Sequence, residues 1–379
     1  MDKTLALILA GGKGTRMGAL CRNRPKPMLP VTGGCRVIDF TLSNCVRSGL
    51  NKITLLLDYQ SEKIEEYVRK WQMKNSLYIE IDYIVPSSDS YTGTANAVYQ
   101  NIDYLNNSET EQVLILAADH IYHMDYREML YFHRKSSADV TVSVASVPFD
   151  QVHKFGTVLV QDDVRIVDFI EKSENSNSNL ASMGIYIFDK RLLVKRLIED
   201  AVNPRSRHDF GYSIMPDSVG RDKVFAYPFT EYWQDIGTPE AYYWSNMDIL
   251  TSDIHDSFKS RVLTGESEGQ FFNDSDQENI RNCFVGPGCT IEGSVENSIL
   301  TSGVRIAKDA VVLDSILMDS VRIGRGSYVS RCILEQGSVV GRNCIIYESA
   351  GIRVISDFVT RDLIGSDRKF LISNLNKLR

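Results

Sequence analysis

Short apolar runs alternate with amphipathic stretches through the first two thirds of the chain. Uncharged runs at 5–10, 53–57 and 112–117 are typical of strands that are buried on both faces of a sheet. After the second run, apolar residues recur at helical spacing behind Ser61, which favours a helix that Ser61 caps. Strands that alternate with helices predict an α/β domain with a doubly wound, parallel sheet, whose ligands bind at the carboxyl ends of the strands.

From about residue 280 the pattern changes to a repeat of 17 residues. Each period divides into roughly 6, 6 and 5 residues, which is the hexapeptide signature of a parallel β-helix. Each coil would have three short faces, with one aliphatic residue pointing inward from each. Three sets of positions recur every 17 residues: Val295, Val312, Val329 and Ile346; Ile306, Ile323 and Val340; and the triplets Ser298-Ile299-Leu300, Ser315-Ile316-Leu317 and Cys332-Ile333-Leu334.

Between these two patterns the chain is polar and acidic and contains the stretches SDIHDS, GESEG and NDSDQEN. We interpret this part as an extended linker. The predicted organisation is therefore an α/β domain at 1–250, a linker at 251–280, and a β-helix domain with a C-terminal tail at 281–379. A solenoid of this kind often serves assembly or regulation rather than chemistry.

A glycine-rich loop follows the first apolar run and reads Gly11-Gly12-Lys13-Gly14-Thr15-Arg16. Glycines let backbone N–H groups approach an anion without interference from Cβ atoms. Lys13, Arg16 and the later Lys26 add positive charge beside the loop, which points to a nucleoside triphosphate. The spacing is neither GxxxxGK[ST] nor GxGxxG, so the loop is not a Walker loop or a dinucleotide-binding fingerprint.

Composition narrows the class of protein. The net charge of -7 argues against nonspecific nucleic-acid binding. No apolar run approaches the roughly 18 residues of a membrane span, and the N-terminus does not have the pattern of a signal peptide. The seven cysteines form no CxxC pair, which favours reduced thiols and a cytoplasmic location.

Several motifs together resemble one enzyme family. The sequence is similar to the sugar-phosphate nucleotidyltransferases, and among them to the ADP-glucose pyrophosphorylases, also called glucose-1-phosphate adenylyltransferases. The resemblance covers nearly the whole chain. The motifs that carry it are AGGKGTRM at 10–17, KPMLP at 26–30, GGCRVIDFTLSN at 33–44, DHIY at 119–122 and YWQDIGT at 232–238.

The resemblance implies a Rossmann-like nucleotidyltransferase domain followed by a left-handed parallel β-helix. It also implies the synthesis of ADP-glucose and pyrophosphate from ATP and glucose 1-phosphate, for glycogen, by an allosteric homotetramer or a hetero-oligomer with a paralogous subunit. Three alternatives stay open: a pyrophosphorylase that uses UTP, dTTP or GTP, a silent regulatory subunit of a pyrophosphorylase complex, and a bifunctional enzyme whose β-helix transfers acyl groups. The last is weakened because the only histidine near the β-helix, His255, lies in the predicted linker.

The resemblance also implies roles for individual residues. It assigns catalysis to Arg16, Lys26 and Asp119, and a Mg²⁺ ion to Asp119 and Asp235. It assigns ATP binding to Leu9, Ala10, Gly11, Gly12, Gly14, Thr15, Arg16, Gly93 and Thr94. It assigns glucose 1-phosphate to Glu171, Lys172, Ser182, Gly184 and Asp235.

The reaction implied by the resemblance needs no protein base, because the attacking phosphate is already ionised at pH 7. Catalysis then consists of positioning and charge neutralisation. His120 and His123 lie in a predicted loop without a third ligand nearby, which argues against zinc.

Some positions depart from the family pattern. Ser87-Ser88 stand where glutamines often precede the GTA turn at Gly93, which puts base selectivity in doubt. Asn23, between Arg22 and Arg24, stands where many regulated members have a basic residue that binds sugar-phosphate activators. We therefore expect weak activation, or none, by fructose 1,6-bisphosphate.

Overall fold

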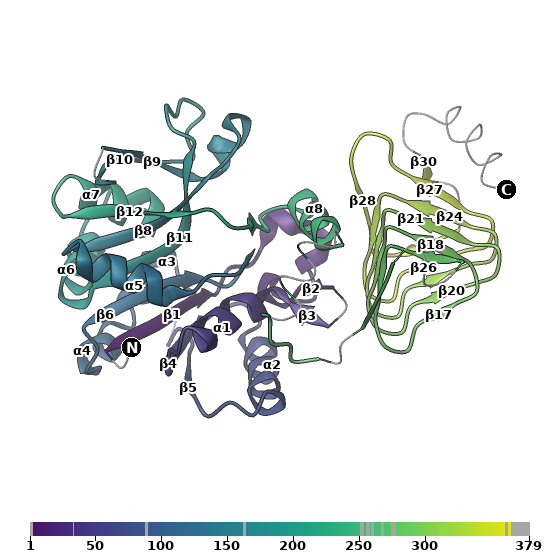
Figure 1. Ribbon diagram of the computed structural model, residues 1–379, viewed down its shortest axis with the longest axis horizontal. Coiled ribbons are helices and arrows are strands. Elements are labelled where there is room, and N and C mark those ends of the chain that lie inside the picture. The colour runs from purple at the N-terminus through teal and green to yellow at the C-terminus, as the bar shows by residue number, and fades with distance from the viewer. Residues whose placement is uncertain are drawn as a thin grey trace. The chain divides into compact units, whose positions relative to one another are not determined.

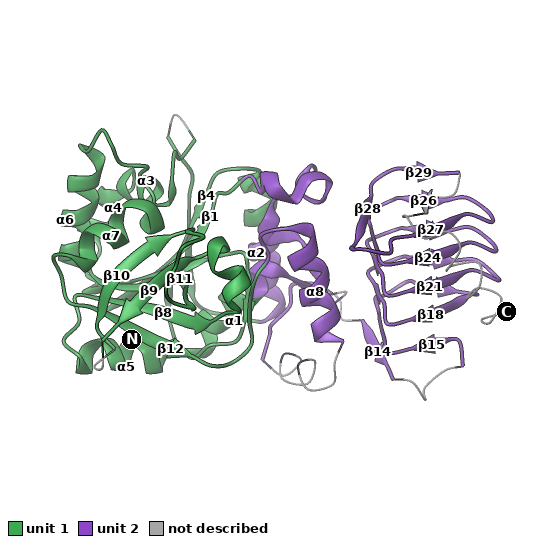
Figure 2. Ribbon diagram, turned by 90° about the horizontal axis from the view of Figure 1, so that it is seen from above, with its two compact units in different colours: residues 1–12, 40–66, 76–235 green, residues 13–39, 67–75, 236–379 purple. Residues whose placement is uncertain are grey.

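Two compact units make up the chain (Figure 2). Unit 1 consists of residues 1–12, 40–66 and 76–235, and unit 2 of residues 13–39, 67–75 and 236–379. The computed structural model describes residues 3–32, 34–87, 90–161, 164–250, 254, 258, 261–266, 269–273, 278–360 and 363–364.

A nine-stranded sheet forms the centre of unit 1 (Figure 1). Its main path runs β10-β9-β11-β6-β1-β4-β5, and β8 joins β11 to β12. The sheet is mixed, because β1, β4, β5 and β6 run parallel whereas β11 is antiparallel to β6 and β8. Its strands are β1 (Thr4–Ala10), β4 (Lys52–Leu57), β5 (Glu80–Ile84), β6 (Gln112–Ala117), β8 (Val140–Ser146), β9 (Gly156–Val160), β10 (Ile166–Glu171), β11 (Leu180–Asp189) and β12 (Val224–Phe229).

Helices cover both faces of this sheet. Unit 1 contains α3 (Thr94–Tyr99), α4 (Ile102–Asn107), α5 (Tyr126–Lys135), α6 (Lys190–Ala201) and α7 (Met215–Val219), with the π-helix η4 (Phe210–Ile214) and the 3₁₀ helix η3 (Phe149–Lys154). Helices α1 (Val37–Arg47) and α2 (Ser61–Lys74) are each divided between the two units, and the 3₁₀ helices η1 (Thr15–Cys21) and η2 (Lys26–Met28) belong to unit 2.

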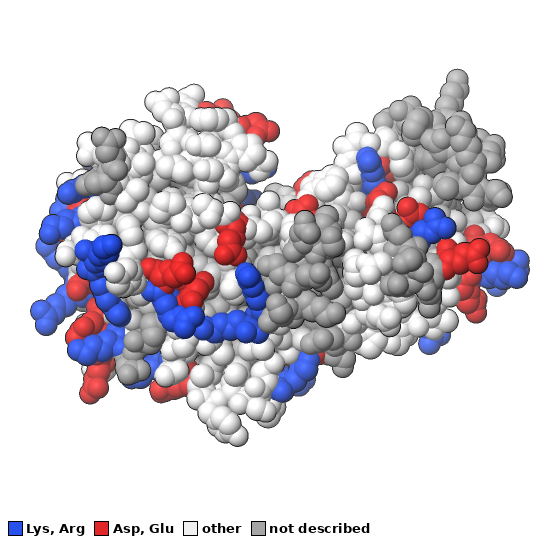
Figure 3. Space-filling model, in the orientation of Figure 1, with Lys and Arg blue, Asp and Glu red and all other residues white. Residues whose placement is uncertain are grey.

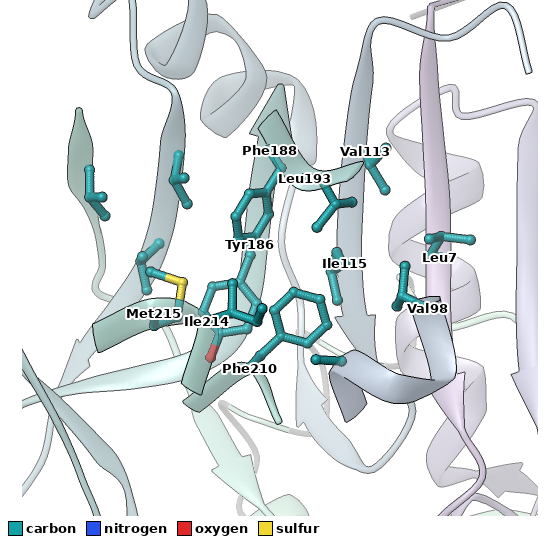
Figure 4. Close-up of a cluster of buried hydrophobic side chains, with 14 of the residues drawn as sticks. Leu7, Val98, Val113, Ile115, Tyr186, Phe188, Leu193, Phe210, Ile214 and Met215 are labelled. Atoms are coloured by element: carbon teal, nitrogen blue, oxygen red, sulfur yellow. The ribbon is translucent and has the colours of Figure 1, made fainter. Parts of the chain in front are cut away.

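One face packs in a cluster with α3, α6, η4 and α7, in which Leu7, Val98 and Phe210 meet (Figure 4). On the other face, His133 of α5 is hydrogen-bonded to Thr141 of β8 at 2.8 Å. Burial on both faces explains why β1 reads as an unbroken apolar run.

The C-terminal part of unit 2 is a parallel β-helix of three sheets. The predicted register is confirmed, since Val312 pairs with Val329, Ile306 with Ile323 and Ile316 with Ile333. The fold class, an α/β domain followed by a β-helix, is likewise confirmed, whereas the expectation of a parallel sheet is wrong because β11 runs antiparallel to β6 and β8. The first sheet contains β14 (Gln270–Phe272), β16 (Cys283–Val285), β19 (Ile299–Leu300), β22 (Ile316–Leu317), β25 (Cys332–Leu334) and β28 (Arg353–Ile355). The second contains β15 (Ile280–Arg281), β18 (Ser294–Glu296), β21 (Val311–Leu313), β24 (Tyr328–Ser330), β27 (Ile345–Tyr347) and β30 (Leu363–Ile364), and the third β17 (Thr290–Ile291), β20 (Arg305–Ile306), β23 (Arg322–Ile323), β26 (Val339–Val340) and β29 (Phe358–Val359).

A ladder of polar side chains holds one corner of the coils. Asn282, Asn297 and Asp314 each adopt a left-handed backbone conformation, with φ between 45° and 47°. Asparagine and aspartate tolerate this conformation better than most residues. Their side chains also bond along the stack, because Nδ2 of Asn282 donates to Asn297 at 2.9 Å and Nδ2 of Asn297 donates to Asp314 at 3.3 Å.

The sheet that contains β19, β22 and β25 is buried on both sides. Leu300, Leu317 and Leu334 belong to the interior core of the β-helix. The isoleucines that precede them point to the opposite side because side chains alternate along a strand, yet Ile316 and Ile333 are both 0% exposed. The repeated Ile-Leu pair therefore packs against two different parts of unit 2.

The segment 13–39 belongs to the same unit as the β-helix and α8 (Pro239–Ile249). The hydroxyl of Tyr242 in α8 donates to the carbonyl of Pro30 at 2.5 Å, and that of Tyr243 donates to the carbonyl of Asp314 at 2.7 Å. Arg24 donates to Gln336 at 2.9 Å. The predicted boundaries at 250 and 280 stay predictions. Much of the predicted linker, including His255, and the tail from residue 365 lie outside the described residues.

Charge is mixed on the molecular surface. On the face drawn in Figure 3, lysine and arginine side chains intermix with aspartate and glutamate side chains over the described residues. None of the helices in the described part of the chain combines the length and the apolar character that a membrane span requires.

A buried carboxyl group lies where α1 begins in unit 2. Oδ2 of Asp39 accepts hydrogen bonds from the Tyr67 hydroxyl at 2.7 Å and from the backbone N–H of Arg36 at 2.9 Å. Burial raises the pKa of Asp39 to about 7. The same tyrosine hydroxyl accepts from the backbone N–H of Gly265 at 3.2 Å, so the cluster also fixes the chain that leads to the β-helix.

We expect Asp39→Asn to reduce the pH dependence of stability. Between about pH 4 and pH 7, Asp39 keeps its proton in the folded protein and loses it in the unfolded chain. The free energy of unfolding therefore falls as pH rises through this range, by up to about 1.4 kcal/mol per pH unit from this group. Above pH 7 the group is ionised in both states and contributes no further slope. Urea unfolding at pH 5, 6, 7 and 8 measures the slope, with exposed Asp103→Asn as the control. Equal slopes for the wild type and Asp39→Asn would contradict the assignment.

Candidate active site

A cavity of about 440 Å³ opens in unit 1 beside the carboxyl ends of β1, β4 and β6. This volume lies within the usual range for small-molecule sites. It brings together predicted residues from distant parts of the chain. Those that line it are Leu9, Gly11, Gly12, Gly93, Thr94, Asp119, Glu171, Lys172, Ser182, Gly184 and Asp235.

Strand register explains why the glycine loop and Asp119 meet. Leu9 of β1 pairs with Ala117 of β6, and the next residue, Ala118, donates its backbone N–H to the carbonyl of Leu9 at 3.2 Å. Asp119 therefore emerges beside Gly11. Parallel strands place their carboxyl ends at one edge, which is where open α/β sheets bind ligands.

A short antiparallel ribbon brings Asp235 to the same place. Strand β13 (Trp233–Asp235) pairs with β7 (His120–Tyr122), with Asp235 directly opposite His120. One oxygen of each carboxylate, of Asp119 and of Asp235, and a nitrogen of His120 all lie within 4.8 Å of one another. The two carboxylates predicted to bind a metal are thus adjacent, although they come from distant parts of the sequence.

The imidazole of His120 is buried between these carboxylates and Trp233. Its Nε2 atom lies 3.6 Å from an oxygen of Asp119 and 3.8 Å from an oxygen of Asp235. Its Nδ1 atom accepts a hydrogen bond from the indole N–H of Trp233 at 3.3 Å. Trp233 also packs on Phe155, with ring centroids 5.2 Å apart, so both rings are fixed in place.

Glu171 lies at another part of the cavity wall, between two glycines. A Cβ atom on either Gly156 or Gly211 would lie 2.4 Å from Oε2 of Glu171, so glycine at both positions leaves room for the carboxylate in this orientation. Burial raises the pKa of Glu171, although the ammonium group of Lys172, 3.3 Å away, opposes the shift. The result is a nearly buried acceptor that faces a ligand site.

The backbone of Lys172 adopts the left-handed conformation, with φ of 50°. This conformation is uncommon for a residue with a side chain. The ammonium group lies 5.6 Å from the centre of the Tyr212 ring, and the guanidinium of Arg207 lies 4.3 Å from the centre of the same ring. Cation–π attraction thus helps to hold Lys172 beside the cavity.

The GTA turn is joined to the segment Asp209-Phe210-Gly211. The backbone N–H groups of Ala95 and Asn96 both donate to the carbonyl of His208, at 2.9 and 3.0 Å. The Thr94 hydroxyl donates to Asp209 at 2.8 Å and accepts from the backbone N–H of Phe210 at 2.9 Å. The close approach that Gly93 permits is therefore to the protein's own backbone, and its role toward a nucleotide stays a prediction.

Ser182 and Gly184 lie where the pairing of β11 with β8 is interrupted. Gly184 has φ of 68°, and its backbone N–H donates to the Ser182 hydroxyl at 3.2 Å. A Cβ atom on Gly184 would lie 3.7 Å from the His120 ring. This turn therefore covers the imidazole on the side of the cavity.

The remaining predicted residues do not line this cavity in unit 1. Ala10 is buried in β1, whereas Gly14, Thr15, Arg16 and Lys26 belong to unit 2. Within unit 2, Lys26 is 7% exposed, and a Cβ on Gly14 would lie 3.3 Å from its Cβ. The catalytic and ATP-binding roles of these four residues stay predictions.

Sequence reasoning missed several residues of the cavity wall. Asp58 follows β4 and accepts from the Ser90 hydroxyl at 3.1 Å, and Tyr91 accepts from Asn101 at 3.2 Å. A signal for Asp58 exists, because it ends a buried parallel strand as Asp119 does. The contact between Trp233 and His120 has no such signal, because it arises from tertiary packing.

Comparisons with known proteins agree on one family. A family model described as "Nucleotidyl transferase" matches residues 5–252, and one described as "GlmU-like, C-terminal hexapeptide" matches residues 269–351. A protein of Desulfitobacterium hafniense (strain Y51) named glucose-1-phosphate adenylyltransferase is 37% identical over 371 residues, which cover 93% of each chain. Proteins of the same name from Bacillus cereus (strain Q1) and Bacillus anthracis are 38% identical over 327 residues, which cover 83% of this chain and 86% of theirs.

We expect Gly93→Ala to destabilise the folded protein by about 1–3 kcal/mol, the usual cost of overpacking. The added Cβ would lie 2.8 Å from the Arg207 carbonyl and closer still to that of His208, and backbone atoms yield less readily than side chains. Gly220→Ala is the matched control, because its Cβ would approach only the Asp217 carbonyl, at 3.9 Å. Urea midpoints measure the difference; equal midpoints for both variants would contradict the tight fit at Gly93.

Proposed function

This chain belongs to the nucleotidyl transferase family, and we propose that it transfers the adenylyl group of ATP to glucose 1-phosphate, forming ADP-glucose and pyrophosphate. The family assignment rests on a match over more than half of the chain. The choice of ATP and glucose 1-phosphate is supported by the names of relatives at 37–38% identity.

One observation carries the proposal: a single cavity contains both a carboxylate pair and a separate carboxylate–lysine pair. Asp119 and Asp235 are suited to a phosphate-bound divalent cation. Glu171 and Lys172 are suited to a sugar phosphate, since a buried carboxylate accepts hydrogen bonds from hydroxyl groups and an ammonium group binds a phosphate. A hydrolase or a binding module would not require both pairs in one site.

The reaction balances without a proton acceptor on the protein. An oxygen of the glucose 1-phosphate phosphate group forms a bond to the α-phosphorus of ATP. The bond from that phosphorus to the oxygen bridging the β-phosphorus breaks, and the electron pair leaves with pyrophosphate. Because the second pKa of a phosphate monoester is about 6, the nucleophile is ionised at pH 7. The protein contributes positioning and charge.

The donor set fits a hard divalent cation such as Mg²⁺. Asp119 and Asp235 would hold the ion through carboxylate oxygens that lie close together at the cavity wall. When bound, such an ion neutralises charge on the phosphate groups of the nucleotide. Members of this family typically use a divalent metal.

Other residues of the cavity would hold the sugar phosphate. The side chain of Glu171 is 12% exposed and lies between Gly156 and Gly211, and it would accept hydrogen bonds from sugar hydroxyls. Lys172 reaches the cavity from a constrained backbone and would contact the phosphate. Arg16 and Lys26 would offset charge on the leaving pyrophosphate, as the family resemblance implies.

Base selectivity, assembly and control remain parts of this proposal. Because Ser87-Ser88 stand where other family members often have glutamines, UTP, dTTP and GTP stay open as alternative nucleotides. The β-helix would mediate self-association into a tetramer, or association with a paralogous subunit. In unit 2, burial raises the pKa of Glu335, although Arg24 and Arg22 oppose the shift, so the arginines that would bind an anionic activator face an acidic neighbour.

We expect Asp119→Ala and Asp235→Ala each to lower kcat at least about 100-fold, because each removes a ligand that places charge at the reacting phosphate. ADP-glucose formation at saturating ATP, glucose 1-phosphate and Mg²⁺ measures the effect, and exposed Asp103→Ala serves as the control. Thermal unfolding should stay close to that of the wild type. Activity within a few-fold of the wild type in either variant would contradict the metal assignment.

Lys172→Ala should raise KM for glucose 1-phosphate about 10-fold or more and leave KM for ATP nearly unchanged. A charge-assisted contact to phosphate contributes about 1.5–3 kcal/mol in both the ground and transition states. Initial rates with each substrate varied in turn measure this, with Lys135→Ala on α5 as the control. An effect confined to KM for ATP would place Lys172 at the other half of the site.

A further inference from the structure

His120 has the position of a metal ligand but the hydrogen-bonding environment of a non-ligand. Its Nε2 atom is 3.6 Å from Asp119 and 3.8 Å from Asp235, so a cation held by both carboxylates would lie within reach of the imidazole. Three such side chains together would form a two-carboxylate, one-histidine site. Imidazole ligands suit later transition metals such as Ni²⁺ and Zn²⁺, whereas all-oxygen sites suit Mg²⁺ and Mn²⁺.

The other nitrogen of the ring decides between these two kinds of site. A histidine that ligates a metal through one nitrogen almost always donates the N–H of the other to a carboxylate, a carbonyl or water. Here the other nitrogen, Nδ1, faces the indole N–H of Trp233 at 3.3 Å. Indole nitrogen donates and cannot accept, so Nδ1 must accept, and the proton of the neutral ring lies on Nε2.

Packing keeps the ring in this orientation. His120 is 8% exposed, and the Trp233 ring meets its edge at an interplanar angle of 84°. Trp233 is itself held against Phe155, and Gly184 covers the Cε1 side of the imidazole. Rotating the ring by 180° about χ2 would place a C–H against the indole donor and lose the hydrogen bond.

We propose that Trp233 fixes the tautomer of His120, so that its Nε2–H points toward Asp119 and Asp235 and the imidazole stays out of the metal's coordination shell. His120 is then a positioning residue, whose Nε2–H faces the two carboxylates from beyond hydrogen-bond distance and presents a donor to oxygen atoms bound beside them. The site keeps an all-oxygen donor set and open positions for phosphate. Trp233 thus reduces the advantage in affinity that Co²⁺, Ni²⁺ and Zn²⁺ would gain over Mg²⁺ and Mn²⁺ from a coordinated imidazole.

This inference rests on the metal site of the proposed function, and its test does not depend on activity. Electron spin-echo modulation of bound Mn²⁺ detects a directly coordinated ¹⁴N. Calorimetric titration with Co²⁺ and with Mg²⁺ gives the two affinities. The first variant, Trp233→Phe, keeps an aromatic ring but removes the indole donor. The second combines Trp233→Phe with His120→Gln. The matched control is Trp244→Phe, at a tryptophan that is 56% exposed.

We expect the wild type to bind Mn²⁺ without a coordinated nitrogen. Trp233→Phe should gain a coordinated nitrogen and bind Co²⁺ about 10-fold more tightly or better, the size of effect that neighbours of metal ligands usually have. The double variant should lose both gains, and Trp244→Phe should match the wild type.

A coordinated nitrogen in the wild type would overturn the inference, and this result needs no variant to fold. An all-oxygen shell with unchanged Co²⁺ affinity in folded Trp233→Phe would also overturn it, while leaving the proposed function intact. A wild type that binds neither Mn²⁺ nor Mg²⁺ would overturn the metal site itself, and this inference with it.

Discussion

The register of the parallel strands in unit 1 is the constraint on which the site depends. Because β1 pairs with β4 and with β6 so that Ala10 lies opposite Leu57 and Leu9 opposite Ala117, the three strands end at one edge. The glycine loop, Asp58 and Asp119 then emerge together at that edge. A slip of one residue would turn every side chain of a strand to the opposite face and separate these groups. The cross-strand pairing of Asp235 with His120 adds the second carboxylate to a site that the sheet has already placed.

Local periodicity made much of the fold predictable, whereas the details of the site depend on contacts between distant segments. The 17-residue step placed Val312 and Val329 in register because each coil must bury the same position. By contrast, the Glu171 carboxylate packs against glycines at 156 and 211, and Nδ1 of His120 accepts from a tryptophan 113 residues further along the chain. Neither relation leaves a pattern in the sequence between its partners. Family resemblance brought the aspartates and Glu171-Lys172 together as candidates, but it gave no reason for the glycines around them.

The compact units also divide the chain differently from its sequence order. Composition changes near residue 250, which suggested a boundary there, yet the segment 13–39 is compact with the β-helix and α8. Buried hydroxyls explain this association, since Tyr242 and Tyr243 satisfy carbonyls of Pro30 and Asp314. The predicted phosphate-binding residues Arg16 and Lys26 therefore belong to the same unit as the repeats.

The account's central claim is adenylyl transfer to glucose 1-phosphate, and a panel of nucleotides tests it most directly. Purified full-length protein is incubated with Mg²⁺, glucose 1-phosphate and, in turn, ATP, UTP, dTTP or GTP, and pyrophosphate release is followed. We predict release that requires glucose 1-phosphate, with kcat/KM for ATP at least about 10-fold above that for each other nucleotide, a difference of about 1.4 kcal/mol. Release that is fastest with UTP, dTTP or GTP, or no release with any of the four, would contradict it.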